Sequence, residues 1–168
     1  MSETTGEARA DRLIHVSLDD RGLPPPTPEI EQERRVALFD LLEDNRFRLP
    51  PRGEAPPPPG PYRLSLSVRD GRLAFEIADE AGAPAHAFLL SLSPFRQVIK
   101  EYFAICASYF DAVKRLPPAQ IEAIDMGRRG LHNEGSHLLM ERLAGKVETD
   151  METARRLFTL ICVLHFKG

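Results

Sequence analysis

Residues 127–143, GRRGLHNEGSHLLMERL, hold the side chains most able to do chemistry in this chain. Two adjacent arginines could bind phosphate or carboxylate through the planar fork of guanidinium donors. Two histidines could exchange a proton near neutral pH. The candidate binding residues are five side chains of this stretch and the aspartate just before it: Asp125, Arg128, Arg129, His132, Asn133 and Glu134.

The glycines in this stretch bear on how these side chains are presented. A continuous helix here would contain three interior glycines, Gly127, Gly130 and Gly135. Each costs about 0.5–1 kcal/mol relative to alanine, or roughly 2–3 kcal/mol for the three. We therefore expect a helix over about 118–130, a turn at 132–136, and a second helix capped by Asn133 or Ser136.

The predicted helix corner, Gly127–Ser136, has two interpretations. In the first it is architecture, with glycine for the turn, asparagine for the cap, and an Asp125–Arg129 pair at i, i+4 spacing. In the second the same side chains are displayed to a partner or a substrate. The sequence leaves both open.

Metal binding and hydrolysis fit the sequence poorly. HNEGSH is H-x-E-x-x-H, and not the H-E-x-x-H that places two histidines on one helical face. The E-x-x-H spacing of Glu134 and His137 has no second copy, which a di-iron bundle requires. G-x-S-x-G, Walker and dinucleotide motifs are absent. We expect no metal and no cofactor, while His132 as general acid–base beside a phosphate held by Arg128 or Arg129 stays possible.

Composition narrows the class of protein. The 168 residues suit one domain with a sizeable core, and the net charge of -3 argues against a generic nucleic-acid binder. Cys106 and Cys162 lie in apolar surroundings and form no C-x-x-C pair, which indicates free buried thiols. The N-terminus has no apolar signal segment, and the run LFTLICVLHF is about half of a bilayer span. We expect a cytoplasmic protein with no membrane segment.

In the first third of the chain, the sequence pattern predicts one strand and one helix. Residues 1–10 are polar and expected to be disordered, and 12–18 alternate as a half-buried strand. Thr27 and Pro28 begin a helix that ends near Asn45. The proline-rich residues 50–60 then form a stiff spacer, read as an insertion within a single domain spanning 11–168.

The rest predicts a β-meander followed by helices. Three alternating runs begin at Tyr62, Leu73 and His86, with a two-residue turn at Asp70–Gly71. Ser93 and Pro94 should start a helix that ends at the LPP of 116–118, where the next begins. TDME, residues 149–152, reads as the capping box of a last, central helix that is apolar over 157–166. The fold class is α+β: a small antiparallel meander of three to four strands, with the first strand on an edge, packed against a C-terminal layer of three to four helices, plus one N-terminal helix.

One family resemblance follows from longer segments. Three segments carry it: FDLLEDN, GPYRLSLSV and EAIDMGRRGLHNEGSHLLMERLAGKVETDMETARRLFTLICVLH. With them, the chain resembles the bacterial Uncharacterised Protein Family 0262 from about Arg12 onward. The GRRGLHNEGS run is specific to it, and the proline-rich residues 50–60 look longer than the family usually carries. The resemblance implies a cytoplasmic single-domain protein. It supplies no activity, cofactor or catalytic residue.

These observations favour a non-enzymatic interaction or regulatory module whose contact surface is centred on the Gly127–Ser136 corner. Its partner would be another protein rather than nucleic acid or membrane. The alternative is an enzyme or RNA-processing factor that acts on a phosphate-bearing substrate through Arg128, Arg129 and His132. A flat or convex surface around the corner would favour the module, whereas a deep pocket converging on His132 would favour the enzyme.

Overall fold

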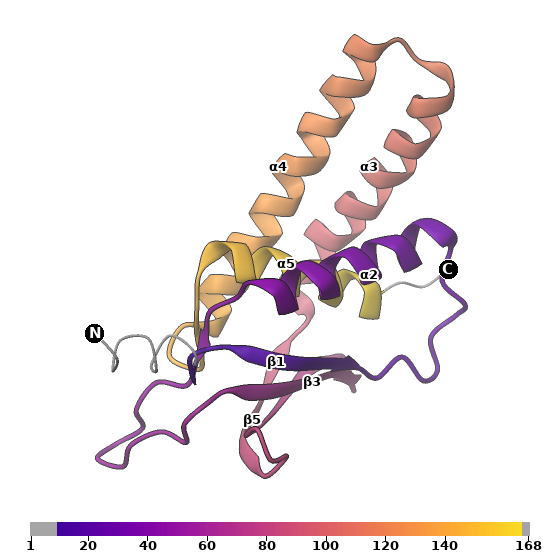
Figure 1. The fold of residues 1–168 in the computed structure, drawn as a ribbon. Coiled ribbons are helices and arrows are strands. Elements are labelled where there is room, and N and C mark those ends of the chain that lie inside the picture. Colours follow the sequence, from indigo (N-terminus) through magenta and orange to yellow (C-terminus); the bar gives the residue numbers. More distant parts are fainter. Residues whose placement is uncertain (1–9, 166–168) are drawn as a thin grey trace.

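The fold is that of a computed structural model, which describes residues 10–165 (Figure 1). Its helices and strands follow in the order β1 (Leu13–Leu18), α2 (Pro28–Glu43), β2 (Phe47–Arg48), β3 (Tyr62–Arg69), β4 (Arg72–Ala78), β5 (Pro84–Ser91), the 3₁₀ turn η1 (Ser93–Phe95), α3 (Arg96–Arg115), α4 (Pro118–Leu143), β6 (Glu148–Thr149) and α5 (Met151–Leu164). The α+β class is confirmed. The prediction of disorder over 1–10 falls, except for Ala10, outside the described residues.

Four strands form the main sheet in the order β1-β3-β4-β5. The predicted meander β3-β4-β5 is confirmed, and its first turn has positive φ at both Asp70 (52°) and Gly71 (72°). The first strand does lie on an edge, but β1 runs parallel to β3, so the sheet is mixed rather than antiparallel. The reason is the long connection through α2, since parallel neighbours need a crossover of this kind.

Two predicted helix starts need correction. Ser93 does not cap α3, because it lies inside the 3₁₀ turn that precedes the helix and makes no side-chain cap there. Thr149 does not cap α5 either, because it is paired with Phe47 in the small β2–β6 sheet. Asp150 takes that role, and its Oδ1 accepts a hydrogen bond of 2.9 Å from the Thr153 amide. Thr27 caps α2 as predicted, through a 3.2 Å bond from the Ile30 amide.

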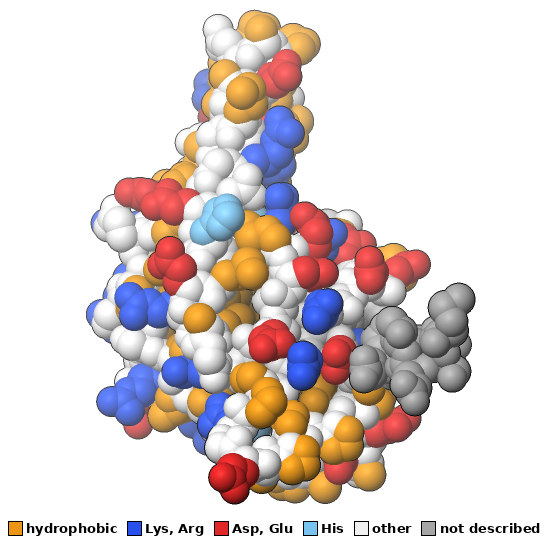
Figure 2. Space-filling view, turned by 90° about the vertical axis from the view of Figure 1, so that its left-hand side faces the viewer, with side chains coloured by type: hydrophobic (Ala, Val, Ile, Leu, Met, Phe, Trp, Pro, Cys, Tyr) orange, Lys and Arg blue, Asp and Glu red, His pale blue; other side chains and the backbone are white. Residues whose placement is uncertain are grey.

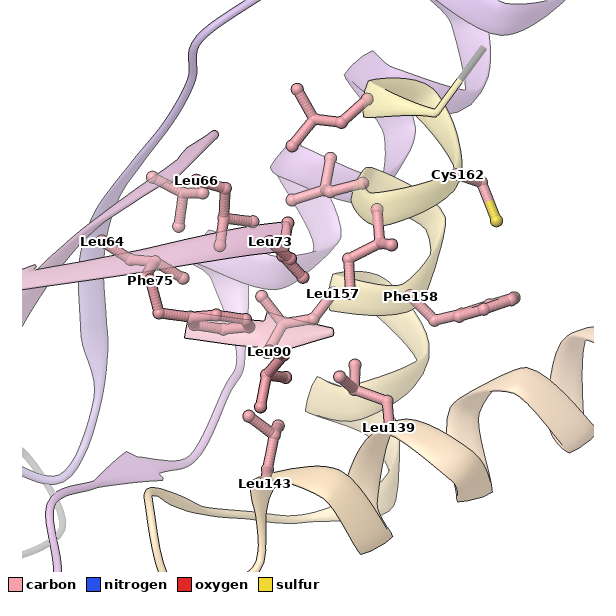
Figure 3. Packing of buried hydrophobic residues seen from close by; sticks show 14 of the residues in the cluster. Leu64, Leu66, Leu73, Phe75, Leu90, Leu139, Leu143, Leu157, Phe158 and Cys162 are labelled. Carbon is pink, nitrogen blue, oxygen red and sulfur yellow. The ribbon is translucent and has the colours of Figure 1, made fainter. Parts of the chain in front are cut away.

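Helix α5 is central, as its apolar sequence predicts. Figure 3 shows Leu157 of α5 facing the sheet residues Leu73 and Leu90, while Phe158 points to the opposite side of the helix. Buried residues follow one another along α5 from Leu157 onward, with only Thr159 partly exposed as far as Leu164. Among residues 10–165, no helix combines the length and apolar character that a bilayer span needs.

The proline-rich stretch 50–60 contains no helix and no named strand, only an isolated bridge between Arg52 and Ala55. One end of it is tied to the sheet, because the Tyr62 hydroxyl donates a 2.7 Å hydrogen bond to the Pro58 carbonyl. That the stretch is a dispensable spacer remains a prediction. A replacement of the stretch that tests it should keep Pro58, because the carbonyl of Pro58 accepts the hydrogen bond from Tyr62.

The side chain of Asn45 joins α2 to the edge strand β1. Its Oδ1 accepts a hydrogen bond from the Leu13 amide (2.7 Å), and its Nδ2 donates to the carbonyls of Leu13 (3.0 Å) and Leu41 (2.8 Å). Leu13 and Leu41 are both fully buried, so water cannot readily replace these bonds. This Asn45 bridge therefore closes the outer edge of β1 at its first residue.

We expect Asn45→Ala to lower the free energy of unfolding by roughly 1–3 kcal/mol, because it leaves buried backbone groups without partners. Urea unfolding followed by circular dichroism measures this. Gln97→Ala, which removes an exposed side-chain bond to Glu101, is the control and should change stability by less than about 0.5 kcal/mol. Equal stability of both variants would contradict the importance of the bridge.

Candidate functional site

The predicted break at Gly127–Ser136 is wrong, because α4 is one helix over its 26 residues. The glycines serve packing instead of a turn. A Cβ on Gly135 would lie 2.1 Å from Cζ of Phe158 in α5, and one on Gly127 would lie 2.8 Å from Cδ1 of Ile105 in α3. Close approach of neighbouring helices therefore explains these two glycines. No contact explains Gly130, whose Cβ would meet open space.

Ser136, expected as a cap of a second helix, lies inside α4 and is fully buried. Its hydroxyl donates a 2.7 Å hydrogen bond to the carbonyl of His132, one turn earlier. A helical serine can satisfy its own hydroxyl in this way without ending the helix. The small side chain thus fits the same tight surface as Gly135.

Three of the predicted site residues do come together on α4. The Asp125 carboxylate accepts hydrogen bonds from Arg128, with Nη2 2.6 Å and Nε 3.0 Å from Oδ1, and lies 3.3 Å from Nε of Arg129. The Arg128 guanidinium also lies 4.2 Å from the ring centre of Tyr109 in α3, in a cation–π contact. Arg128 and Asp125 are each 25% exposed, whereas Arg129 is 59% exposed. Only Arg129 is therefore well displayed.

His132 is partly buried between helices instead. Its ring packs between those of Tyr102 and Phe158, with centroid distances of 5.4 and 5.3 Å. Nε2 lies 2.7 Å from Oγ1 of Thr159, whose own proton goes to the Arg155 carbonyl. Nε2 is therefore the donor. Burial, with the charges of Arg155 and two other arginines, lowers the pKa of His132 to about 4, so the ring is neutral at neutral pH.

The remaining two predicted residues lie apart from this group. Glu134 is exposed and lines a surface cavity of about 510 Å³ together with Glu101 and His137. Asn133 is half-buried, and its Oδ1 has no hydrogen-bond partner among the described residues. The six candidates thus divide between several surroundings and do not converge on one point.

The prediction missed a polar group beneath Arg128. Glu33 of α2 is partly buried there, and this burial raises the pKa of its carboxyl group, while the charge of Arg128 and a hydrogen bond from Tyr102 oppose the rise. Glu33 lies three residues after Ile30 and four before Ala37, which are both buried. This spacing places it on the apolar stripe of α2 and could have identified it from the sequence.

The cysteines beside this group are poor nucleophiles. Burial raises the pKa of Cys106 to about 11, with Glu33 adding to the rise, and burial also raises the pKa of Cys162. Both thiols are free, and at neutral pH they stay protonated. Over residues 10–165, His, Cys, Asp and Glu side chains form no group of three that could hold a metal ion.

Comparison with known proteins gives a consistent result. The family model of the Uncharacterised protein family (UPF0262) matches residues 10–167. The chain is 68% identical to the UPF0262 protein of Roseobacter denitrificans over 157 residues, which cover 94% of this chain and 99% of that protein. It is 66% identical to a relative in Ruegeria sp. strain TM1040 over 157 residues (94% and 99%) and 66% identical to one in Paracoccus denitrificans over 155 residues (92% and 96%). No solved structure matches the chain at a significant level.

We expect Gly135→Ala to lower the free energy of unfolding by about 1–3 kcal/mol, since the added methyl group overpacks against the buried ring of Phe158. Gly130→Ala is the matched control on the same helix. Its methyl group meets open space, so helix propensity alone should stabilise the protein by about 0.5–1 kcal/mol. Chemical denaturation of both variants measures the two effects, and a shared sign would contradict the packing role of Gly135.

His132 also predicts a pH dependence of stability. Because its pKa falls from 6.5 in the unfolded chain to about 4 in the fold, stability should be lost progressively as pH falls from 6.5 to 4. Over the whole of this pH range, the loss in the free energy of unfolding is on the order of 3 kcal/mol. In His132→Gln this part of the slope should disappear, whereas His137→Gln, which changes an exposed histidine of α4, should keep it. Unfolding curves between pH 4 and 7 test this, and identical slopes in the two variants would refute it.

Proposed function

The chain belongs to the Uncharacterised protein family UPF0262, and we propose that it works as a non-enzymatic interaction module. Its contact surface would be the outer half of the α3–α4 hairpin, residues 107–131, called the hairpin arm below. The single observation that carries this proposal is that the arm extends away from the rest of the described chain (Figure 1).

Helix packing explains why the arm is a separate feature. Helix α4 packs on α5 through its C-terminal half, while α3 packs mainly on α4. Beyond this region the two helices have chiefly each other to bury their apolar side chains. Two helices cannot cover apolar residues on every side, so part of that surface stays exposed.

The exposed apolar side chains of the arm are large. Val113 of α3 is 53% exposed and Met126 of α4 is 61% exposed. Figure 2 shows hydrophobic side chains gathered at the end of the projecting helices. Methionine adapts its shape easily to a partner and is common at binding surfaces. A projecting, convex arm with such residues supports a role in contacting another protein.

The charges of the arm favour a protein partner over nucleic acid. It holds four basic residues, Lys114, Arg115, Arg128 and Arg129. Three of them are engaged within the arm, Arg115 by Asp111 and both Arg128 and Arg129 by Asp125. Cations paired in this way are poorly disposed to replace the counterions of a phosphate backbone.

The geometry gives the alternative, an enzyme acting through Arg128, Arg129 and His132, little support. His132 is partly buried and neutral, and it lines none of five surface cavities found among residues 10–165. A general acid–base must reach its substrate at hydrogen-bond distance. Arg128 meanwhile is held by Asp125 and Tyr109.

A photo-cross-linking amino acid placed at Val113 or Met126, in a bacterium that makes this protein, should give adducts with one and the same partner. Mass spectrometry must identify the same partner protein in the adducts from both positions. The purified partner should then bind the wild-type chain, and Met126→Glu should weaken this binding at least tenfold. Since Met126 is exposed, the melting temperature of that variant should stay within a few degrees of wild type.

Phe39 of α2 provides the matched control, because it is 67% exposed and lies outside the arm. The cross-linker at position 39 should not capture the same partner, and Phe39→Glu should leave binding unchanged. Adducts from position 39 alone, or adducts containing only this chain, would contradict the proposal.

A further inference from the structure

Among the described residues, the strand β5 has one edge without a partner. It is the last strand of the main sheet, and within residues 10–165 no strand pairs with it on the side away from β4. Pairing with β4 is regular from Ser91 to His86, with an irregularity only near Pro84. The free edge is therefore a straight row of backbone donors and acceptors seven residues long, from Ala85 to Ser91.

One hydrogen bond identifies which backbone groups face outward. The Leu92 amide donates to the Gly71 carbonyl at 3.3 Å, so position 92 turns its backbone toward β4. Backbone direction alternates along an antiparallel strand. The odd-numbered residues Ala87, Leu89 and Ser91 therefore turn their N–H and C=O groups to the free edge. All three residues are exposed.

Protection that sheet edges usually carry is missing here. Lysine, inward charges and interior proline discourage pairing at natural edges, but residues 85–91 read AHAFLLS, with His86 the one titratable side chain. Leu89 is 47% exposed on this strand. The opposite edge differs, since Asn45 occupies both backbone groups of Leu13 and α2 packs beside β1.

We infer that β5 pairs with β5 of a second copy of this chain, antiparallel and about a two-fold axis at Phe88, so that the two sheets become one. In this register Ala87 lies opposite the partner's Leu89, and Ala85 lies opposite the partner's Ser91. This register overlaps all seven residues. Shifting it by two residues in either direction would instead require Ser93 or the turn before Pro84 to pair.

Charge and symmetry favour a second copy over a foreign strand. Two neutral β5 strands bring no like charges together. A contact of β5 with itself also closes after two copies. Continued growth would need the β1 edge, which the Asn45 bridge obstructs.

Light scattering coupled to gel filtration of the full chain tests the inference. Wild type should elute at about twice its 18.8 kDa mass at micromolar concentration. The double variant Ala87→Lys, Leu89→Lys places like charges opposite each other across the axis and should be monomeric. Ala87→Lys, Leu89→Glu places opposite charges there and should recover the dimer, and it puts the lysine, rather than a second carboxylate, opposite Glu76 of the same chain. Both positions are exposed, so the circular dichroism spectra should match wild type.

Three outcomes would overturn the inference: a monomeric wild type, a dimer that survives the double-lysine change, or a failure of the charge pair to restore it. If the lysine variant misfolds, hydrogen exchange of wild type decides instead, because the amides of Ala87, Leu89 and Ser91 should become protected as concentration rises. Met126→Glu should remain dimeric, which separates this test from the hairpin arm. A dimer lost only in Met126→Glu would place the contact on the arm and refute the β5 pairing.

Discussion

The contact between the backbone of Gly135 and the ring of Phe158 is the constraint on which the helical layer depends. Without a side chain at position 135, α4 lies close enough to α5 for Leu139 and Leu143 to join the core (Figure 3). Helix α5 is itself buried between the sheet and the other helices, so α4 is anchored through its C-terminal half. The N-terminal half of α4 then leaves the body with α3 as its main partner.

A polar group lies where the hairpin leaves the body, and it joins four helices. Glu33 comes from α2, Tyr102 from α3, Arg128 from α4, and Thr159 of α5 binds His132. A buried polar side chain is tolerated when neighbours satisfy it, and here most neighbours belong to a different helix. These contacts relate the direction of the arm to the position of the core. The side chains that first suggested catalysis thus include several that hold the helices together.

Local patterns in the sequence were sufficient for most of the elements. Alternation of apolar residues predicts β3, β4 and β5, and Asp70–Gly71 predicts their first turn, because positive φ is tolerated at both positions. Proline at Pro28 and Pro118 marks the starts of α2 and α4 for an equally local reason, since its fixed φ suits a first helical turn. The pairing of Asp125 with Arg129 also follows from spacing along one helix.

By itself, then, the sequence determined the class of fold, the four strands of the main sheet and the starts of α2 and α4, since these depend on neighbours along the chain. Only the tertiary structure decided whether α4 breaks. The cost of three glycines is local, but the ring that Gly135 admits comes from Phe158, 23 positions later. The same holds for His132, whose burial and depressed pKa depend on residues of α3 and α5. Contacts between segments far apart in sequence have no periodicity that the sequence alone would reveal.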